Sequence, residues 1–148
     1  MAYVISLYHI VIRTKYSIMA INESHELRLY KYIGGMVTNK NGILYNINGM
    51  PDHVHMLISL PPTWSVSEFI KVLKGETSKW IKQSGLFPEF KGWGTGYAAI
   101  SYNIMDKDMI DTYISRQKSH HKRDNFAKEY KELLESNGIN DPEYLSDP

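Results

Sequence analysis

Two histidines separated by a single residue are the side chains of this chain best suited to chemistry. Residues 51–60 have the pattern of a β-strand, whose side chains alternate between two faces, so His53 and His55 point to the same side. The opposite side is apolar and carries Val54, Met56, Ile58 and Leu60. Two imidazoles at a separation fixed by a strand can bind one divalent cation. Because His-x-His also arises by chance in a chain with six histidines, a pair of surface or core histidines is the alternative.

A tyrosine and a glutamine further along the chain could act at one point. Tyr113 and Gln117 are four residues apart, a spacing that places two side chains on the same face of a helix. The amide oxygen of Gln117 is a hard ligand suited to Mg²⁺ or Mn²⁺ beside imidazoles. The phenol of Tyr113 could attack phosphorus, but its ordinary pKa of about 10 requires activation by a metal or a base. The alternative is that Tyr113, one of 11 tyrosines, only packs its helix.

The composition predicts one globular domain covering residues 1–148. Hydrophobic residues make up 43% and charged residues 22%, which excludes wholesale disorder and allows a real core. Cysteine is absent, so disulfides, thiolate metal sites and cysteine nucleophiles are excluded. With no apolar run of membrane-spanning length and no charged signal-peptide start, we expect a cytoplasmic protein without a membrane partner. The net charge of +1 means that any nucleic-acid binding depends on local patches.

The elements that must position these side chains follow from apolar periodicity and turn residues. Strands are expected at residues 4–13, 43–48, 53–60 and 97–103. Helices are expected from an Asn22 cap to 41, from 65 or 67 to 83, at 106–117 and at 124–137. The order βαββαβ within residues 3–103 indicates an α+β, ferredoxin-like sandwich with an antiparallel sheet. C-terminal helices follow within residues 106–138, and the tail at 139–148 is expected to be irregular.

In a ferredoxin-like fold the first and third strands are central, and both core helices cover one face of the sheet. The apolar side of the histidine strand should meet those helices. His53 and His55 are therefore expected on the opposite, open face, where a substrate can bind. His9 falls in the first strand, and the pattern does not fix the direction in which it points.

Three motifs in order give the chain a resemblance to a known family. They are Pro-Asp-His53-Val-His55-Met-Leu, Trp93-Gly-Thr-Gly-Tyr97 and Tyr113-Ile-Ser-Arg-Gln117-Lys-Ser-His-His-Lys. The chain resembles the single-tyrosine HUH transposases of the insertion-sequence-200-like family in these three motifs, in the order in which they occur, and in the length of the chain. The resemblance extends over nearly the whole chain.

The resemblance implies a role for each motif residue. His53, His55 and Gln117 match the ligands of a catalytic divalent cation, Mg²⁺ or Mn²⁺, and Tyr113 matches the nucleophile. The implied reaction is attack of Tyr113 on a phosphodiester of single-stranded DNA, which leaves a 5′-phosphotyrosine link and a free 3′-hydroxyl. Attack of another 3′-hydroxyl on that link then rejoins the DNA.

The resemblance also implies partners and a location. Members of the family are homodimers that recognise DNA hairpins at the ends of their element, with the tyrosine helix of one subunit acting in trans on the metal site of the other. The implied location is the cytoplasm of a bacterial or archaeal cell, at the nucleoid when the protein acts.

A cluster of cations follows the predicted nucleophile and is a candidate DNA contact. Residues 116–123 contain four formal positive charges and no acid, at a place where a phosphate backbone must approach. The candidate DNA-binding side chains are Arg116, Lys118, His120, His121, Lys122 and Arg123. A solvated helix end with favourable C-terminal cations is the alternative.

Other functions remain open from the sequence alone. A rolling-circle replication initiator uses the same paired histidines and tyrosine but is usually larger. A domesticated relative that binds and nicks hairpins would look almost identical. A non-catalytic module that binds single-stranded nucleic acid would place aromatic residues in the central strands, where this chain has histidines.

Overall fold

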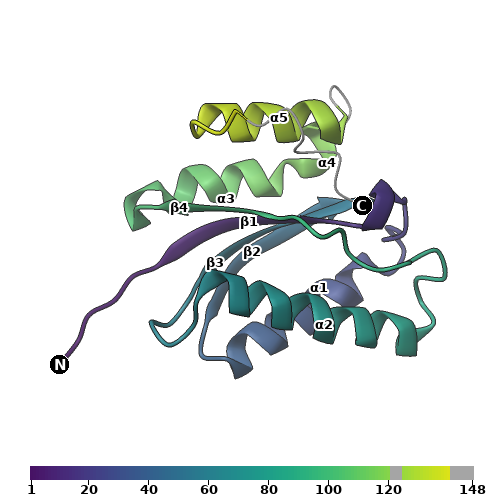
Figure 1. The fold of residues 1–148 in the computed structure, drawn as a ribbon, viewed down its shortest axis with the longest axis horizontal. Helices are drawn as coiled ribbons and strands as arrows, with labels where there is room; N and C mark the ends of the chain where they lie inside the picture. The colour runs from purple at the N-terminus through teal and green to yellow at the C-terminus, as the bar shows by residue number, and fades with distance from the viewer. Residues whose placement is uncertain (121–124, 141–148) are drawn as a thin grey trace.

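A four-stranded antiparallel sheet between two layers of helices forms the body of the protein (Figure 1). The structure is a computed structural model, and it describes residues 1–120 and 125–140. The strands are β1 (Leu7–Arg13), β2 (Ile43–Met50), β3 (His53–Ser59) and β4 (Ala98–Tyr102), in the order β2-β3-β1-β4. The first and third strands are therefore central, and the predicted α+β sandwich is confirmed.

The first helical layer contains α1 (Glu26–Asn39) and α2 (Val66–Ser84) and covers one face of the sheet (Figure 1). The Ser65 side chain caps α2 by accepting a hydrogen bond from the backbone N–H of Glu68. Asn22 does not cap α1 as expected, because its carboxamide oxygen accepts from the N–H of His25 in the turn before the helix. The apolar face of β3 meets this layer, and Val54, Met56 and Ile58 are fully buried there.

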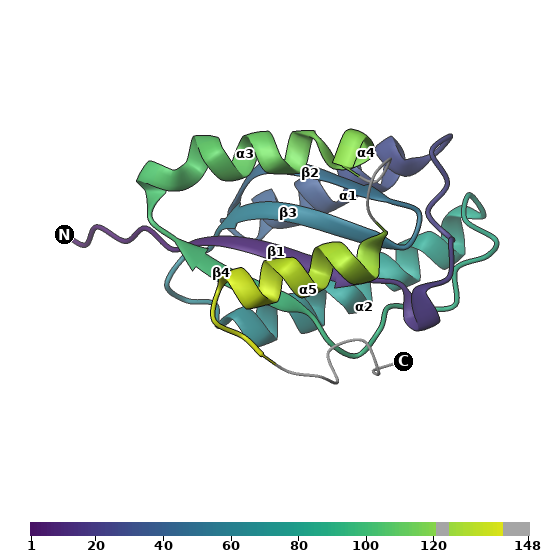
Figure 2. The same ribbon diagram turned by 90° about the horizontal axis from the view of Figure 1, so that it is seen from above.

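The second layer covers the face on which the histidines lie, so the prediction of an open face was wrong (Figures 1 and 2). It contains the short turn η2 (Ile104–Asp106) and the helices α3 (Lys107–Ser115), α4 (Gln117–His120) and α5 (Phe126–Ser136). The physical reason is that this face also carries apolar side chains, which must be buried. Leu7 and Leu57 pack against α3, and Val11 packs against α5.

The predicted helix at 106–117 is broken at Arg116, which has φ −94° and ψ 14°. The N–H of Arg116 bonds to the carbonyl oxygens of Thr112 and Tyr113, which closes the last turn of α3. Gln117 starts the separate helix α4 and is completely buried. The predicted helix at 124–137 is α5, whose cap is Asn125.

The β2–β3 hairpin fixes the position of His53. β2 runs through Met50 and β3 begins at His53, so the turn contains only Pro51 and Asp52. Gly49 lies opposite Val54, and a Cβ atom at Gly49 would collide with the backbone carbonyl of His53. This close approach requires glycine.

None of the described helices combines the length and apolar content needed to cross a membrane.

The two helical layers should differ in local stability. α5 rests on a small cluster formed by Val11, Ala98, Phe126, Tyr130 and Leu134, whereas α2 contributes to the large core beneath α1. Because local opening of α5 exposes less apolar surface, we expect its amides to exchange roughly tenfold or more faster than those of α2. Native-state hydrogen exchange followed by mass spectrometry measures both helices in one sample. Equal protection of α2 and α5 would contradict this view of the second layer.

Candidate active site

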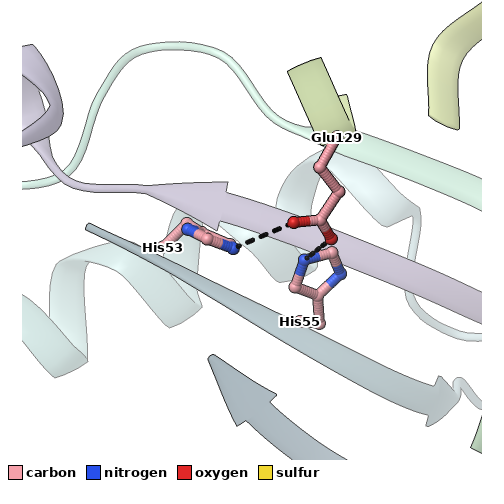
Figure 3. Close-up of side chains that lie close together, drawn as sticks. All are labelled: His53, His55 and Glu129. Atoms are coloured by element: carbon pink, nitrogen blue, oxygen red, sulfur yellow. Dashed lines mark ion pairs between the residues drawn. The ribbon is translucent and has the colours of Figure 1, made fainter. Parts of the chain in front are cut away.

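A carboxylate and two imidazoles meet in the space between β3 and α5. His53 and His55 point from β3 toward the second helical layer, and Glu129 points from α5 back toward the sheet (Figure 3). His55 Nε2 lies 3.1 Å from Glu129 Oε1, and His53 Nε2 lies 3.8 Å from Glu129 Oε2. All three residues are buried, with exposed fractions of 0%, 1% and 2%.

Tyr113 and Gln117 approach the same carboxylate from α3 and α4. The Tyr113 hydroxyl donates to Glu129 Oε1 over 2.6 Å, and the Gln117 amide donates to the same oxygen over 3.1 Å. The amide oxygen of Gln117 lies 3.4 Å from His53 Nε2. The fold thus brings together the four residues that the sequence selected as nucleophile and metal ligands, despite the break between α3 and α4.

The ring of His53 is oriented by the residue before it. Asp52 Oδ1 lies 2.7 Å from His53 Nδ1, and an ionised carboxylate can only accept a hydrogen bond. In the neutral ring the proton therefore lies on Nδ1, and the Nε2 lone pair faces the Gln117 amide oxygen and Glu129. A carboxylate behind a ligating histidine is the usual device that fixes the tautomer of a metal ligand.

The ring of His55 is oriented by His9, whose role the sequence did not reveal. His9 Nε2 lies 2.8 Å from His55 Nδ1, and the two rings stack with their centroids 5.0 Å apart. Burial, with a smaller contribution from the charge of His55, lowers the pKa of His9 to about 3. A neutral His9 can accept the Nδ1 proton of His55. His55 Nε2 then faces Glu129, where it donates a hydrogen bond when protonated and offers its lone pair to a cation when that proton is lost.

These donor atoms fit a divalent cation. Within the part of the chain that the structure describes, His53, His55 and Glu129 each offer one ligand atom, and these atoms lie within 4.8 Å of one another. Ligands about 2.1 Å from an octahedral ion lie about 3.0 Å apart when adjacent and about 4.2 Å apart when opposite. The observed separations of 3.1, 3.4 and 3.8 Å fall in this range. Two imidazoles, a carboxylate and an amide oxygen form a set that suits Mn²⁺ or Mg²⁺.

The electrostatics hold Tyr113 in its protonated form. Burial raises the pKa of Tyr113 well above its ordinary value, and the hydrogen bond and negative charge of Glu129 raise it further. Burial alone would raise the pKa of Glu129 as well, but the hydrogen bond and charge of His55, helped by Tyr113 and His53, bring it below the ordinary value. These shifts favour a neutral phenol that donates its hydrogen bond to an ionised carboxylate.

Glu129 is the site residue that the sequence reasoning missed. It lies on the buried stripe of α5, which contains Phe126, Glu129, Tyr130 and Leu134. A lone acid on an otherwise apolar helix face was the available signal, because a buried charge needs partners. Phe126, one turn earlier, stacks on the His53 ring with a centroid distance of 3.9 Å.

The predicted DNA-contact residues fall into three groups. Arg116 is exposed at the break between α3 and α4. Lys118 is half-buried, and its ammonium binds the Glu26 carboxylate at 2.9 Å and the Gly49 carbonyl, so it fastens α4 to α1 and β2. The side chain of His120, and the whole of His121, Lys122 and Arg123, lie outside the described residues.

Comparison with known proteins identifies the family. The family model for IS200-like transposases matches residues 3–117. The chain is 27% identical over 89 residues to the ISDra2 transposase TnpA of Deinococcus radiodurans, covering 55% of this chain and 62% of that protein. It is 34% identical over 71 residues to the transposase of insertion sequence element IS200 of Salmonella typhimurium, covering 48% of this chain and 47% of that protein. The chain therefore spans about half to three fifths of the length of these curated relatives.

Two solved structures share the fold. A crystal structure of a candidate transposase from Deinococcus radiodurans R1 superposes with a TM-score of 0.62 and 24% identity, covering 79% of this chain and 95% of that one. A REP-associated tyrosine transposase bound to a REP hairpin superposes with a TM-score of 0.60 and 14% identity, covering 82% of this chain and 72% of that one. At these identities the structures support the fold alone, whereas the family model covers most of the chain. The chain belongs to the family of IS200-like transposases.

Proposed function

We propose that this family member cleaves and rejoins single-stranded DNA at the hairpin-marked ends of an element, through a 5′-phosphotyrosine intermediate. The observation that carries the proposal is the convergence of one phenol, two imidazoles and a glutamine amide around the Glu129 carboxylate. The phenol is the nucleophile of the proposed reaction, and the other groups form a cation site beside it. The relative bound to a REP hairpin supports a hairpin as the form of DNA that is recognised.

The proposed ligands of the cation are His53 Nε2, His55 Nε2, the amide oxygen of Gln117 and the carboxylate of Glu129. When bound, Mg²⁺ or Mn²⁺ offsets the charge of a phosphate and polarises the bond to be broken. Asp52 and His9 hold the two imidazoles in the tautomers that ligation requires.

Tyr113 supplies the covalent step. Its oxygen forms a bond to the phosphorus of a phosphodiester, and the bond from phosphorus to the 3′ oxygen breaks. The DNA 5′ phosphate is then joined to Tyr113, and the departing strand ends in a 3′-hydroxyl that gains the proton lost by the phenol. Attack by a different 3′-hydroxyl restores the phenol and a phosphodiester, so no nucleotide cofactor is consumed.

The second helical layer must open before DNA can reach these groups, because the histidines, Gln117 and Glu129 are almost completely buried. We propose that α5 moves, because it is held by the smaller apolar cluster. Arg116, exposed beside Gln117, is the described side chain best placed to meet a phosphate, and His120, His121, Lys122 and Arg123 are proposed to extend that contact. Lys118 is proposed to keep α4 in place during the movement.

A homodimer is the proposed assembly. α3 follows the edge strand β4 through the short turn η2, a connection that allows Tyr113 to serve the histidines of a second subunit. Within the single chain Tyr113 lies against its own site, with its ring 5.8 Å from the ring of His55. Both placements give the same chemistry.

A covalent-trapping assay tests the function. Labelled single-stranded oligonucleotides that carry the hairpin ends of the encoding element are incubated with protein and Mn²⁺ or Mg²⁺ and separated on a denaturing gel. We expect a metal-dependent protein–DNA adduct that is lost in Tyr113→Phe and falls at least a hundredfold in His55→Ala, because these variants remove the nucleophile and a metal ligand.

Tyr45→Phe is the matched control, since Tyr45 packs in the same apolar cluster as Tyr113 but lies outside the cation site. It should form the adduct normally. Hairpin binding without any adduct in the wild-type protein would mean that the chain recognises DNA without cleaving it.

His9 should matter for the cation although it is not a ligand. We expect His9→Phe to weaken Mn²⁺ binding 10- to 100-fold, because nothing then accepts the His55 Nδ1 proton. His9→Gln keeps an acceptor and should lose much less affinity. Isothermal titration calorimetry measures both variants, with circular dichroism as the test that they fold. If His9→Phe binds Mn²⁺ with the affinity of the wild-type protein, His9 does not support the cation site.

A further inference from the structure

Glu129 lies on α5, beyond the residues 3–117 that the family model covers. It is nevertheless the residue that the other side chains of the site contact in common. A single oxygen, Oε1, lies 2.6 Å from the Tyr113 hydroxyl and 3.1 Å from each of Gln117 Nε2 and His55 Nε2. The nucleophile and the cation ligands therefore depend on the same atom.

The capacity of that oxygen is limited. A carboxylate oxygen offers two lone pairs, and the hydroxyl of Tyr113 and the amide of Gln117 both donate to Oε1. A cation held by His55 Nε2 takes the place of a proton there and meets Oε1, 3.1 Å from that nitrogen, whereas Oε2 faces His53 Nε2 at 3.8 Å. When Oε1 ligates the cation, only one of its two lone pairs is left for Tyr113 and Gln117, so one of these two donors gives way.

Tyr113 is the donor that can leave. Gln117 is held by burial, and its amide oxygen already faces His53 Nε2 from the position in which it would be a ligand. The Tyr113 side chain is half-buried and is the one that must turn toward a phosphate in the proposed reaction. Loss of its bond to Glu129 therefore follows from both roles.

We propose that the Glu129 carboxylate is exchanged between Tyr113 and the catalytic cation, so that it restrains the nucleophile in the metal-free protein and releases it when the cation binds. The proposal rests on the cation site put forward above. It makes Glu129 a positioning residue for Tyr113. The Tyr113 hydroxyl is then free to turn toward a phosphate only when the metal is bound.

Exchange of one carboxylate between two partners is a competition, and competition acts equally in both directions. Removal of the phenol should leave Glu129 available and tighten cation binding. This is the opposite of what a nucleophile that helps to bind the metal would do.

The test is Mn²⁺ binding to the full chain without DNA, measured by calorimetry and by the electron paramagnetic resonance signal of free Mn²⁺. We expect Tyr113→Phe to bind Mn²⁺ roughly tenfold more tightly than wild type, since a hydrogen bond to a charged group no longer has to be broken. Glu129→Gln should bind at least tenfold more weakly, and Tyr45→Phe should bind like wild type.

A double-mutant cycle assigns the effect to Glu129. In the Glu129→Gln background, Tyr113→Phe should leave the Mn²⁺ affinity unchanged, because there is no carboxylate left to share. If Glu129→Gln does not fold, the Mn²⁺ affinity of Tyr113→Phe relative to wild type tests the exchange.

The opposing outcomes are distinct. Unchanged or weaker Mn²⁺ binding in Tyr113→Phe, or the same tightening with and without Glu129, would overturn the exchange while leaving the cation site intact. Absence of Mn²⁺ binding in the wild type and in Tyr113→Phe would overturn the exchange together with the cation site.

Discussion

The negative charge of Glu129, buried between the sheet and the second helical layer, is the constraint on which the site depends. An ionised carboxylate away from water is stable only when nearby donors and cations compensate it. Here the compensation comes from His55, Tyr113 and Gln117, which belong to three different elements. One charge therefore holds together β3, α3, α4 and α5.

Several features outside the site serve this arrangement. The break at Arg116 ends α3 and allows Gln117 to point inward, and Lys118 then fastens α4 through Glu26. Gly49 allows β2 to approach the backbone at His53, which sets the start of β3. His9 lies within hydrogen-bond distance of His55, and Asp52 lies within hydrogen-bond distance of His53, so that both rings of the proposed cation site are held in place. Each feature reduces the freedom of a group that must be in place before chemistry starts.

The same packing that forms the site also closes it. The large core beneath α1 and α2 keeps the histidine strand rigid, whereas α5 is held by a small apolar cluster and by the polar contacts of Glu129. A helix held in this way can move without loss of the sheet, because local openings draw on the least stable contacts. In the proposed function, imidazoles on a rigid strand and a movable helix that carries Glu129 would let a DNA strand reach the buried cation site.

The sequence by itself indicated an antiparallel sheet with the first and third strands at its centre, and it selected His53, His55, Tyr113 and Gln117 as candidate site residues. These follow from local patterns, namely alternation on a strand, periodicity on helices and the spacing of polar side chains. The family resemblance added an order of motifs that no single element provides, and the family model bears it out.

Only the tertiary structure decided that the histidine face is covered, that Arg116 breaks a helix, and that His9 and Glu129 belong to the site. The physical reason is distance along the chain. His9 meets His55 across 46 residues and Glu129 meets Tyr113 across 16, through packing that buries apolar side chains of β1, α3 and α5. Local periodicity can identify Glu129 as an acid on an apolar helix face, but the side chains that it contacts depend on the tertiary structure.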